Sequence, residues 1–450
     1  RLTRTVGKRQ GFYSDCLQNF TFVKNTIMLI PAHVREHFDQ VVAGLQKRNI
    51  DAAPQLKVLL SLDEERRATQ ATLDQTLAQA NAIAKEIGQL FKQGAGEEAA
   101  AKKQESAALK DSSKELQDKL QEVSSQLQEV LYQLPNIPHP SVPSGNSDED
   151  NEEVFQKGSI PSLDDNALPH WELAKKYKLI DFELGAKITG AGFPVYTGKG
   201  AKLQRALINY FLDFNTAAGY GEVQVPHLVN EVSGLGTGQL PDKEGQMYHV
   251  TEDDLYLIPT AEVPVTNLYR DSLIQEDELP VKLTAYTPCF RREAGSYGTH
   301  VRGLNRLHQF DKVEVVRISH PEQSYAALDE MVDHVGKLLS SLDLPYRILR
   351  LCGGDLGFTA ALTYDFEVFS TAQNRWLEVS SVSNFESFQA NRLKLRYKGK
   401  DGKKQLAHTL NGSALALPRI VAGLLENHQK SDGIHIPKAL VPYTGFDIIN

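Results

Sequence analysis

The stretch "PCFRREAG", residues 288–295, places two adjacent arginines and a glutamate in a run whose neighbours favour a β-strand. Successive side chains of a strand point to opposite faces, so an extended run would put Arg291 and Glu293 on one face and Arg292 on the other. Exposed strands often carry such charges for solubility alone, and the octapeptide by itself favours that simpler interpretation. The segments around it decide whether the charges form a site.

A second strand follows after a polar loop. The loop "SYGTHVRGLNR", residues 296–306, carries Arg302, and the alternating strand "LHQFDKVEVV" occupies residues 307–316. Together the two strands offer a guanidinium for phosphate, a hydrogen-bond acceptor, a stacking ring and a carboxylate for an ammonium group. Because so many charges on one buried face would be costly without ligands, the unit predicts a binding site. The residues that share the second strand's face are His308, Phe310, Lys312 and Glu314.

The rest of the chain from about residue 166 mixes helical stretches with short β-rich runs. Several neighbouring runs are joined by loops too short for a crossover helix, which indicates an α+β fold built on an antiparallel β-sheet flanked by helices. There is no Gly-Lys-Ser/Thr loop and no strand–helix GxGxxG unit, so a nucleotide would be held by side chains on the sheet. The β-rich runs are 221–229, 254–260, 283–293, 307–316, 364–370 and 375–382, and the clearest helical stretch is 201–217.

The segment from residue 55 to 134 lacks proline, and its glycines are almost confined to "QGAGEE", residues 93–98. Apolar residues recur at spacings of four and three on both sides of this break, which is a heptad pattern. We expect two helices folded into an antiparallel coiled-coil hairpin, each limb of about 35 residues reaching on the order of 50 Å. The seam residues are Leu73, Leu77, Ala80, Ala84, Ile87 and Phe91, then Leu109, Leu116, Leu120, Val123, Leu127, Val130 and Leu134.

Two ordinary helices of a globular bundle are the alternative to a protruding arm. The faces away from the seam are almost wholly polar, which favours the arm because little apolar surface is left for a third layer. Lysines on such limbs usually form a solvated face, but they are also the local patch that could hold a phosphate backbone. They are Lys85, Lys92, Lys102, Lys103, Lys110, Lys114 and Lys119.

Domain boundaries follow from these patterns. Residues 28–134 form a helical domain, and the proline-rich and then acidic stretch within 135–165 is interpreted as a linker. Residues 166–450 form the second domain. Residues 1–27 are basic and precede Met28, where we expect the native protein to begin; an organelle transit peptide is the alternative, and amino-terminal sequencing would decide.

Composition limits the class of protein. The chain has 450 residues, 41% of them apolar and 24% charged, as in a globular protein of at least two domains. No apolar run is long enough to span a membrane, and a net charge of −8 means that a nucleic acid would have to meet a local basic patch. Three widely spaced cysteines fit free thiols in a reducing compartment and predict a cytoplasmic protein.

The segments "FRREAG" and "HQFDKVE" resemble motif 2 of the class II aminoacyl-tRNA synthetases, and the chain from about 28 to 450 is similar to the seryl-tRNA synthetase family. Each short motif is weak alone, but they follow one another in the family's order. The supporting segments are "TGQLP" at 237–241, "PTAEVP" at 259–264, "LEVSSVSNF" at 377–385, "FQANR" at 388–392 and "LNGSALALPR" at 410–419.

The resemblance implies a two-step reaction. Serine condenses with ATP, with Mg²⁺ bridging the phosphates, and the seryl group then passes to the terminal adenosine of tRNA(Ser); by family analogy tRNA(Sec) is a further candidate. Catalysis would rest on positioning and on stabilising charge at the α-phosphate. The family also implies tRNA binding by the hairpin and a homodimer through motif 1, residues 201–229, in which Pro226 would be structural.

The resemblance also implies the site residues. The catalytic group is Arg291, Glu314 and Arg419. The serine pocket is Thr260, Ala261, Glu262, Arg291, Glu314 and Ser413. The ATP contacts are Arg291, Arg292, Glu293, Phe310, Glu378, Val379, Ser380, Ser381 and Arg419, with Glu378 and Ser381 as metal ligands. Strand alternation nevertheless turns Arg292 away from the site and predicts that it tolerates substitution.

Two other functions are compatible with parts of the sequence. A synthetase-like ligase could load an amino acid onto a carrier protein, although such relatives typically lack the arm. A coiled-coil interaction protein with an inactive body is the other possibility, which the complete set of site residues opposes. Serine-dependent pyrophosphate exchange followed by charging of total tRNA distinguishes the three.

Overall fold

The computed structural model describes residues 30–163, 167–293 and 302–450. They fall into two compact units, one ending at Ile137 and the other beginning at Pro138. The prediction that the protein begins at Met28 lies outside the described residues. None of the described helices is both long and apolar enough to cross a membrane.

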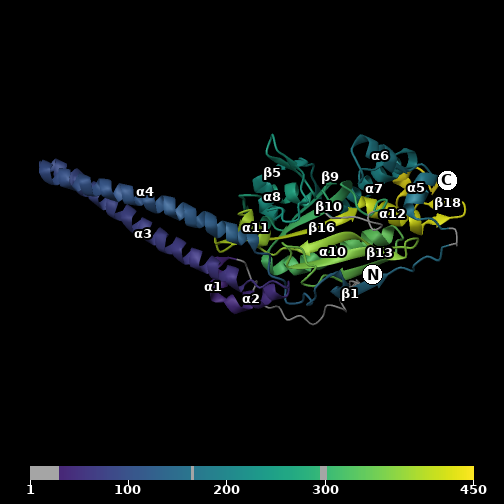
Figure 1. The fold of residues 1–450 in the computed structure, drawn as a ribbon, viewed down its shortest axis with the longest axis horizontal. Helices are drawn as coiled ribbons and strands as arrows, with labels where there is room; N and C mark the ends of the chain where they lie inside the picture. Colours follow the sequence, from purple (N-terminus) through teal and green to yellow (C-terminus); the bar gives the residue numbers. More distant parts are fainter. Residues whose placement is uncertain (1–29, 164–166, 294–301) are drawn as a thin grey trace, which may run out of the picture. The chain divides into compact units, whose positions relative to one another are not determined.

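The first unit is helical and contains a hairpin of two long helices (Figure 1). A turn of three residues, in which Gly94 has φ +78°, separates α3 from α4, and the two helices pack against each other along their length. The predicted hairpin is therefore confirmed. The helices of this unit are α1 (Pro31–Glu36), α2 (Phe38–Gln46), α3 (Ala53–Lys92) and α4 (Gly96–Gln133).

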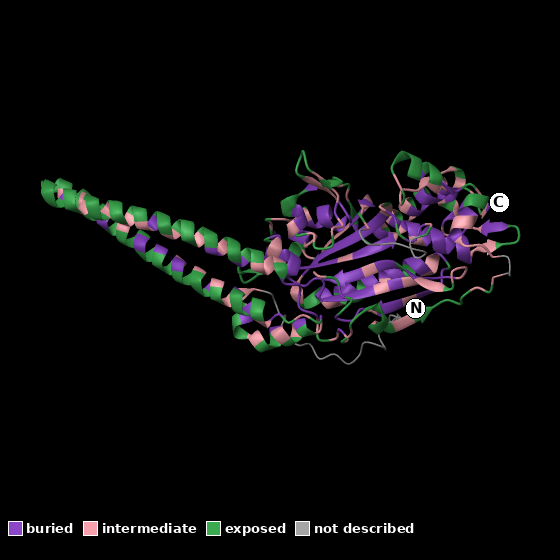
Figure 2. Ribbon diagram, in the orientation of Figure 1, coloured by how far each residue is buried: buried purple, intermediate pink, exposed green. Residues whose placement is uncertain are grey.

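The observed seam of α3 agrees with the predicted one at every second seam residue. At the seam residues between them, the buried position lies one residue earlier in the chain. The buried residues are Leu73, Thr76 and Ile83, whereas Leu77 and Phe91 are 38% and 54% exposed. Apolar residues at adjacent positions make two heptad phases possible, and the observed phase buries the larger Ile83 in preference to its neighbour. On α4 the predicted seam residues alternate with exposed ones as expected (Figure 2). The predictions that are wrong concern Leu77, Ala84 and Phe91.

The second unit is built on an eight-stranded sheet in the order β1-β11-β12-β13-β16-β10-β9-β4 (Figure 1). Every neighbouring pair is antiparallel except β4 and β9, so the predicted α+β class is confirmed. The strands are β1 (Glu152–Lys157), β4 (Gly221–Glu222), β9 (Val281–Phe290), β10 (Gln309–Ser319), β11 (Tyr346–Arg350), β12 (Leu362–Ser370), β13 (Arg375–Asn384) and β16 (His408–Ala416).

Two sequence predictions fail within this unit. The segment 135–165 was expected to be a linker, but β1 lies in it and pairs with β11, so an acidic run contributes an edge strand. Pro226 was expected in a strand, but β4 ends at Glu222 and Pro226 lies in an irregular segment. Proline has no N–H to donate to a neighbouring strand, which is consistent with the early end of β4.

Three helices form one hydrophobic core with the sheet: α7 (Gly198–Ala217), α10 (Ser324–Ser341) and α12 (Leu417–Asn427). On β12 the core side chains alternate with polar ones. Tyr364 and Phe366 belong to the core, whereas Asp365 and Glu367 line a cavity on the other face. The sheet therefore separates the core helices from a polar face that is available for ligands.

Shorter elements complete the second unit. The remaining helices are α5 (His170–Lys176), α6 (Phe182–Ile188), α8 (Glu231–Thr237), α9 (Glu262–Asn267), α11 (Phe388–Arg392) and α13 (Val441–Thr444). The remaining strands are β2 (Ile180–Asp181), β3 (Val195–Tyr196), β5 (Leu228–Asn230), β6 (His249–Val250), β7 (Leu255–Leu257), β8 (Leu273–Gln275), β14 (Arg396–Lys398), β15 (Lys404–Leu406), β17 (Gln429–Lys430), β18 (Gly433–His435) and β19 (Ile448–Ile449).

Candidate active site

A cavity of about 810 Å³ lies on the polar face of the sheet. Of the residues predicted for the site, Ala261 and Glu314 are buried and Arg292 is exposed, and these three do not line the cavity. The predicted residues that do line it are Thr260, Glu262, Arg291, Glu293, Phe310, Glu378, Val379, Ser380, Ser381, Ser413 and Arg419.

The strand that carries the two arginines ends earlier than predicted. β9 stops at Phe290; the Arg291 N–H still donates to His308 O at 2.9 Å, but the Arg292 N–H turns to Gln246 O at 2.8 Å. Glu293 then has φ +48°, so the run is not extended through it. Arg291 and Glu293 nevertheless both line the cavity, because the backbone turns after β9.

The Arg291 side chain lies against the aromatic ring that was predicted to stack on adenine. Its guanidinium carbon is 5.3 Å from the centre of the Phe310 ring, and its Nε donates to Pro259 O at 3.4 Å. Glu293, which also lines the cavity, pairs with Arg306 at 2.8 Å. The planar guanidinium of Arg291 can therefore meet an anion while its face rests on the ring.

A group of charged and hydroxyl side chains forms the floor of the cavity next to Arg291: Thr260 and Lys312 line it, and the buried Glu314 lies directly behind them. Lys312 Nζ lies 2.6 Å from Glu314 Oε2 and donates to Thr260 Oγ1 at 2.9 Å. The Thr260 hydroxyl donates in turn to Glu314 Oε2 at 3.3 Å. Because Lys312 and Glu314 are almost wholly buried, their charges depend on each other and on these hydrogen bonds.

A second carboxylate completes this floor. Asn411 Nδ2 donates to Glu262 Oε2 at 2.8 Å and to Glu314 Oε1 at 3.1 Å, so one amide bridges the two acids. Gln389 Nε2 donates to Glu262 Oε1 at 2.6 Å. Burial and the neighbouring Glu314 carboxylate raise the pKa of Glu262 to about 7. The floor thus groups two carboxylates around one amide, with Glu262 on the cavity lining and Glu314 behind it.

A bulge in β16 places Ser413 beside this floor. Lys312 pairs with Ala416, whereas Glu314 pairs with Ser413, so β16 carries one extra residue between the two pairs. Leu415, inside the bulge, has φ +84°, which is rare for a branched side chain and marks local strain. The bulge thereby sets Ser413 directly opposite Glu314.

A bulge in β13 also brings the two predicted metal ligands together. Residues three apart in a regular strand face opposite sides, but Glu367 pairs with Glu378 while Asp365 pairs with Ser381, which leaves one extra residue on β13. Glu378 and Ser381 consequently both line the cavity. The extra residue is Val379, because Ser380 still pairs with Phe366.

The metal-ligand candidates have a third neighbour that the sequence did not indicate. The Ser381 hydroxyl donates to Asp365 Oδ1. Burial and the Glu378 carboxylate hold the pKa of Asp365 well above its ordinary value. No group of three or more His, Cys, Asp or Glu side chains positioned to hold a metal occurs among the described residues. Hard oxygen donors and one or two carboxylates suit Mg²⁺, which keeps most of its waters.

Arg419 reaches the same cavity from the start of α12. Proline at the first turn fits the transition from β16 into this helix, because an N–H is not needed there. Arg419 Nη1 donates to Glu378 O at 2.6 Å and lies 3.3 Å from Glu378 Oε2, and its Nε donates to Asn305 O at 3.1 Å. The guanidinium is thus held between β13 and the segment 302–306.

Comparison with known proteins identifies the family. The model described as seryl-tRNA synthetase N-terminal domain matches residues 28–138, and the tRNA synthetase class II core domain (G, H, P, S and T) matches residues 247–428. The serine–tRNA ligase of Salinibacter ruber is 52% identical over 415 residues, which span 92% of this chain and 97% of the relative. The chain belongs to the seryl-tRNA synthetase family. The serine–tRNA ligase of Chlorobaculum parvum is 48% identical over 94% of the synthetase and 100% of the relative.

Solved structures agree with this assignment. The seryl-tRNA synthetase of Pyrococcus horikoshii, complexed with ATP, has a TM-score of 0.86 and 33% identity over 94% of the synthetase and 99% of that chain. The cytoplasmic serine–tRNA ligase of Naegleria fowleri, in complex with AMP, has a TM-score of 0.80 and 27% identity over 92% and 95%. The synthetase is therefore an ATP-dependent serine–tRNA ligase, and neither the carrier-protein ligase nor the inactive interaction protein is supported.

Sequence reasoning missed several polar residues that line the cavity or hydrogen-bond to its lining. Asn411 stands two residues before Ser413 on β16, so strand alternation could have placed both on one face. Lys312 was placed on the correct face of β10 but was given no role. Gln389 and Asp365 had no signal of their own, because each acts on a carboxylate or hydroxyl that is distant in the chain.

Proposed function

We propose that the buried floor of the cavity binds L-serine. The Glu262 and Glu314 carboxylates would take the substrate ammonium, and Thr260 and Ser413 would supply hydroxyl partners for its side chain. The observation that carries this proposal is the Asn411 amide bridging the two carboxylates, 2.8 Å from one and 3.1 Å from the other. A pocket that hydrogen-bonds a hydroxyl rejects the analogue lacking it, so alanine would leave these groups unpaired.

ATP would occupy the adjoining part of the cavity. Phe310 and Arg419 would enclose the adenine ring, Glu293 would accept a hydrogen bond at its edge, and Arg291 would hold the α-phosphate and the serine carboxylate. The position of Arg291 between Phe310 and the serine floor supports this arrangement. Arg291, Glu314 and Arg419 would then act on the reacting groups by charge and position.

Mg²⁺ would be held by Glu378 and Ser381, and its chemistry would be to neutralise charge on the ATP phosphates. Burial and, after it, the Glu378 carboxylate raise the pKa of Asp365, and a cation at this place would relieve the repulsion between the two acids. The predicted contacts at Val379 and Ser380 belong to the same bulged segment. Titrating Mg²⁺ against Glu378→Gln in pyrophosphate exchange tests this, and an unchanged Mg²⁺ requirement would count against it.

The hairpin of α3 and α4 would bind tRNA(Ser), and tRNA(Sec) is a second candidate for the same surface. Deleting residues 70–120 should spare serine-dependent pyrophosphate exchange and abolish charging of tRNA. Intact charging by the deletion variant would refute the role of the arm. Assembly as a homodimer through 201–229 is also proposed, and sedimentation of the purified protein tests it.

Location in the cytoplasm is the remaining proposal. The described cysteines, Cys289 and Cys352, are free and buried, which suits a reducing compartment. Fractionation of the source cells with an antibody against the synthetase tests this location, and recovery in an oxidising compartment would overturn it.

A further inference from the structure

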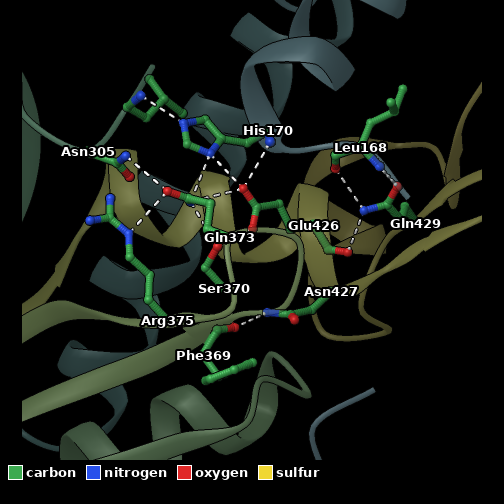
Figure 3. A network of polar contacts seen from close by, with 11 residues as sticks. Leu168, His170, Asn305, Phe369, Ser370, Gln373, Arg375, Glu426, Asn427 and Gln429 are labelled. Atoms are coloured by element: carbon green, nitrogen blue, oxygen red, sulfur yellow. Dashed lines mark hydrogen bonds and ion pairs between the residues drawn. The ribbon is translucent and has the colours of Figure 1, made fainter. Parts of the chain in front are cut away.

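A polar network joins the start of α5 to the end of α12, and its His170 and Glu426 side chains are fully buried (Figure 3). His170 Nδ1 donates to Glu426 Oε1 at 2.8 Å, and the backbone N–H of His170 donates to the same oxygen at 2.9 Å. His170 Nε2 accepts the Leu304 N–H at 2.9 Å. Because Nε2 is an acceptor, the ring proton is on Nδ1, and the ring orients the backbone at Leu304.

Gln373, in the turn between β12 and β13, connects the network to Asn305, the residue that follows Leu304 (Figure 3). Its Nε2 donates to Glu426 Oε1 at 3.1 Å and to Ser370 Oγ at 2.8 Å, and its Oε1 accepts from Asn305 Nδ2 at 3.1 Å. Asn305 is therefore fixed through its side chain as well as through the preceding peptide.

The residues before Leu304 dock on the same part of α5. Gly303 has φ +69°, and a Cβ there would lie 2.3 Å from His170 Nε2, so only glycine lets the chain approach the ring. The Arg302 guanidinium lies 4.7 Å from the Trp171 ring centre and 3.5 Å from Glu172 Oε1. Three consecutive residues thus bind three consecutive residues of α5.

The fixed segment contacts the proposed adenine-binding arginine. Asn305 O accepts from Arg419 Nε at 3.1 Å, so the orientation of the Arg419 guanidinium depends on where that carbonyl points. Buried Glu426 is kept charged, because hydrogen bonds from His170 and Ser370 lower its pKa despite its burial. The position of the Asn305 carbonyl is therefore determined by two contacts: the Leu304 N–H bound to His170 and the Asn305 side chain bound to Gln373.

We propose that His170 is a positioning residue for ATP, which acts with Glu426 and Gln373 to hold the Asn305 carbonyl and thereby aim Arg419. The proposal rests on the assignment of Arg419 to ATP made above. His170 touches no substrate in this role; it acts through the Leu304 peptide. The positioning depends on Nε2, which accepts the Leu304 N–H. Nδ1 donates to Glu426 and thereby holds the ring in place.

Two substitutions separate the two ring nitrogens. The Asn amide lies near the position of Nδ1, so His170→Asn keeps a donor for Glu426 and loses the acceptor for Leu304. The Gln amide reaches the position of Nε2, so His170→Gln keeps an acceptor for Leu304. In serine-dependent pyrophosphate exchange, His170→Asn should raise KM for ATP about tenfold and leave KM for serine within about twofold. His170→Gln should stay within about threefold of the parent for both.

Arg419→Ala supplies the controls. A rise in KM for ATP in this variant supports the assignment of Arg419, and His170→Asn added to it should raise KM for ATP no further. If Arg419→Ala raises KM for ATP and His170→Asn does not, only the positioning role fails. If Arg419→Ala leaves KM for ATP unchanged, the assignment of Arg419 fails and the positioning role fails with it.

Thermal unfolding of each variant separates positioning from folding. Equal effects of the Asn and Gln substitutions, or a KM for ATP that follows Tm across the series, would overturn the proposal. Gln373→Ala provides a second route if the His170 variants do not fold, since Gln373 lies in a surface turn. It should raise KM for ATP about threefold, with KM for serine unchanged, and no change in KM for ATP would overturn the proposal.

Discussion

At the scale of single residues, Arg291 and Arg292 are adjacent but have different surroundings. Arg291 lies against Phe310 in the cavity, whereas Arg292 is exposed. Arg291→Ala should reduce kcat/KM for serine-dependent pyrophosphate exchange about 10³-fold, because a preorganised charge at the phosphate is lost. Arg292→Ala, measured in the same assay, should remain within about threefold of the parent. Comparable losses in the two variants would contradict the assignment.

Glu262 predicts how serine binding depends on pH. Its pKa is raised to about 7 by burial and by Glu314, so it is neutral below that pH and cannot pair with the substrate ammonium. KM for serine should therefore rise as pH falls below about 7, by up to tenfold per pH unit. Steady-state exchange from pH 5.5 to 8.5 measures this. Glu262→Gln should have a high KM for serine with a flatter profile, and a parallel profile would contradict the role of Glu262.

The same pKa predicts an opposite effect on stability. Between 4.5, the ordinary value, and about 7, the folded state holds a proton on Glu262 that the unfolded state has released. Unfolding free energy should consequently fall as pH rises through this window, by at most about 1.4 kcal/mol per unit. Denaturant unfolding of the parent should lose more stability across this window than that of Glu262→Gln. Identical slopes would show that Glu262 does not titrate there.

At the scale of elements, sequence periodicity predicted which helices and strands exist better than it predicted which of their residues face the partner or where the strands end. The hairpin and β9, β10, β12 and β13 were all expected, because their alternation or heptad spacing is set by local residue order. The seam phase at Leu77, the bulge before Ser381 and the end of β9 at Phe290 were not. Each of these depends on a partner distant in the chain, which one sequence does not display.

The same limit applies to the candidate site. Arg291 and Glu262 lie in short recognisable motifs, and the resemblance to a family placed them in one site before any geometry was available. Asn411, which bridges the two carboxylates, and His170, which supports Leu304, act through residues that are far away in the sequence. Their roles became visible only when the strands and helices were brought together.

Within α3, Asp63 concentrates three ion pairs on one buried carboxylate. It lies 2.8 Å from Arg35, 2.9 Å from Arg66 and 3.0 Å from Arg67. Although its burial acts in the other direction, the hydrogen bonds from Arg66 and Arg67 lower its pKa. Its contribution to stability is thus present above the ordinary carboxyl pKa and is lost as pH falls through the lowered value.

Asp63→Asn should therefore destabilise the helical unit by about 2–4 kcal/mol, because three guanidinium groups lose their common anion. Thermal unfolding followed by circular dichroism at neutral pH measures this. Glu65→Gln is the matched control: it breaks the exposed pair with Lys119, 2.9 Å apart, and should cost under about 1 kcal/mol. Pyrophosphate exchange at 25 °C should be unchanged in both, and equal stability of the two variants would refute the role of Asp63.

At the scale of the whole molecule, the two units have different proposed roles. The cavity belongs to the second unit, whereas the lysines proposed for tRNA belong to the first. Since the net charge is −8, attraction to a phosphate backbone has to come from a local group of positive charges, and the hairpin lysines are the proposed group. Charging and activation should accordingly respond to different substitutions.

The lysines of the hairpin predict how tRNA binding depends on salt. Lys102 lies 3.3 Å from Glu86 and Lys119 lies 2.9 Å from Glu65, so neutralising these two also frees a carboxylate. Four other lysines are exposed, and their side-chain ammonium groups make no ion pair or hydrogen bond with any described residue. They are Lys85, Lys92, Lys110 and Lys114.

Changing the four unpaired lysines to glutamine should weaken tRNA(Ser) binding and reduce the slope of log K against log salt by about 0.9 for each lysine that contacts a phosphate of a duplex. The matched control changes Lys102 and Lys119, which are already paired and should contribute a smaller slope per residue. Filter binding from 50 to 300 mM KCl measures the slopes, and pyrophosphate exchange should be unaffected in both variants. The slope reports how many counterions are released where lysines or arginines contact phosphates. An unchanged slope in the fourfold variant would therefore mean that the phosphate backbone is held by other residues.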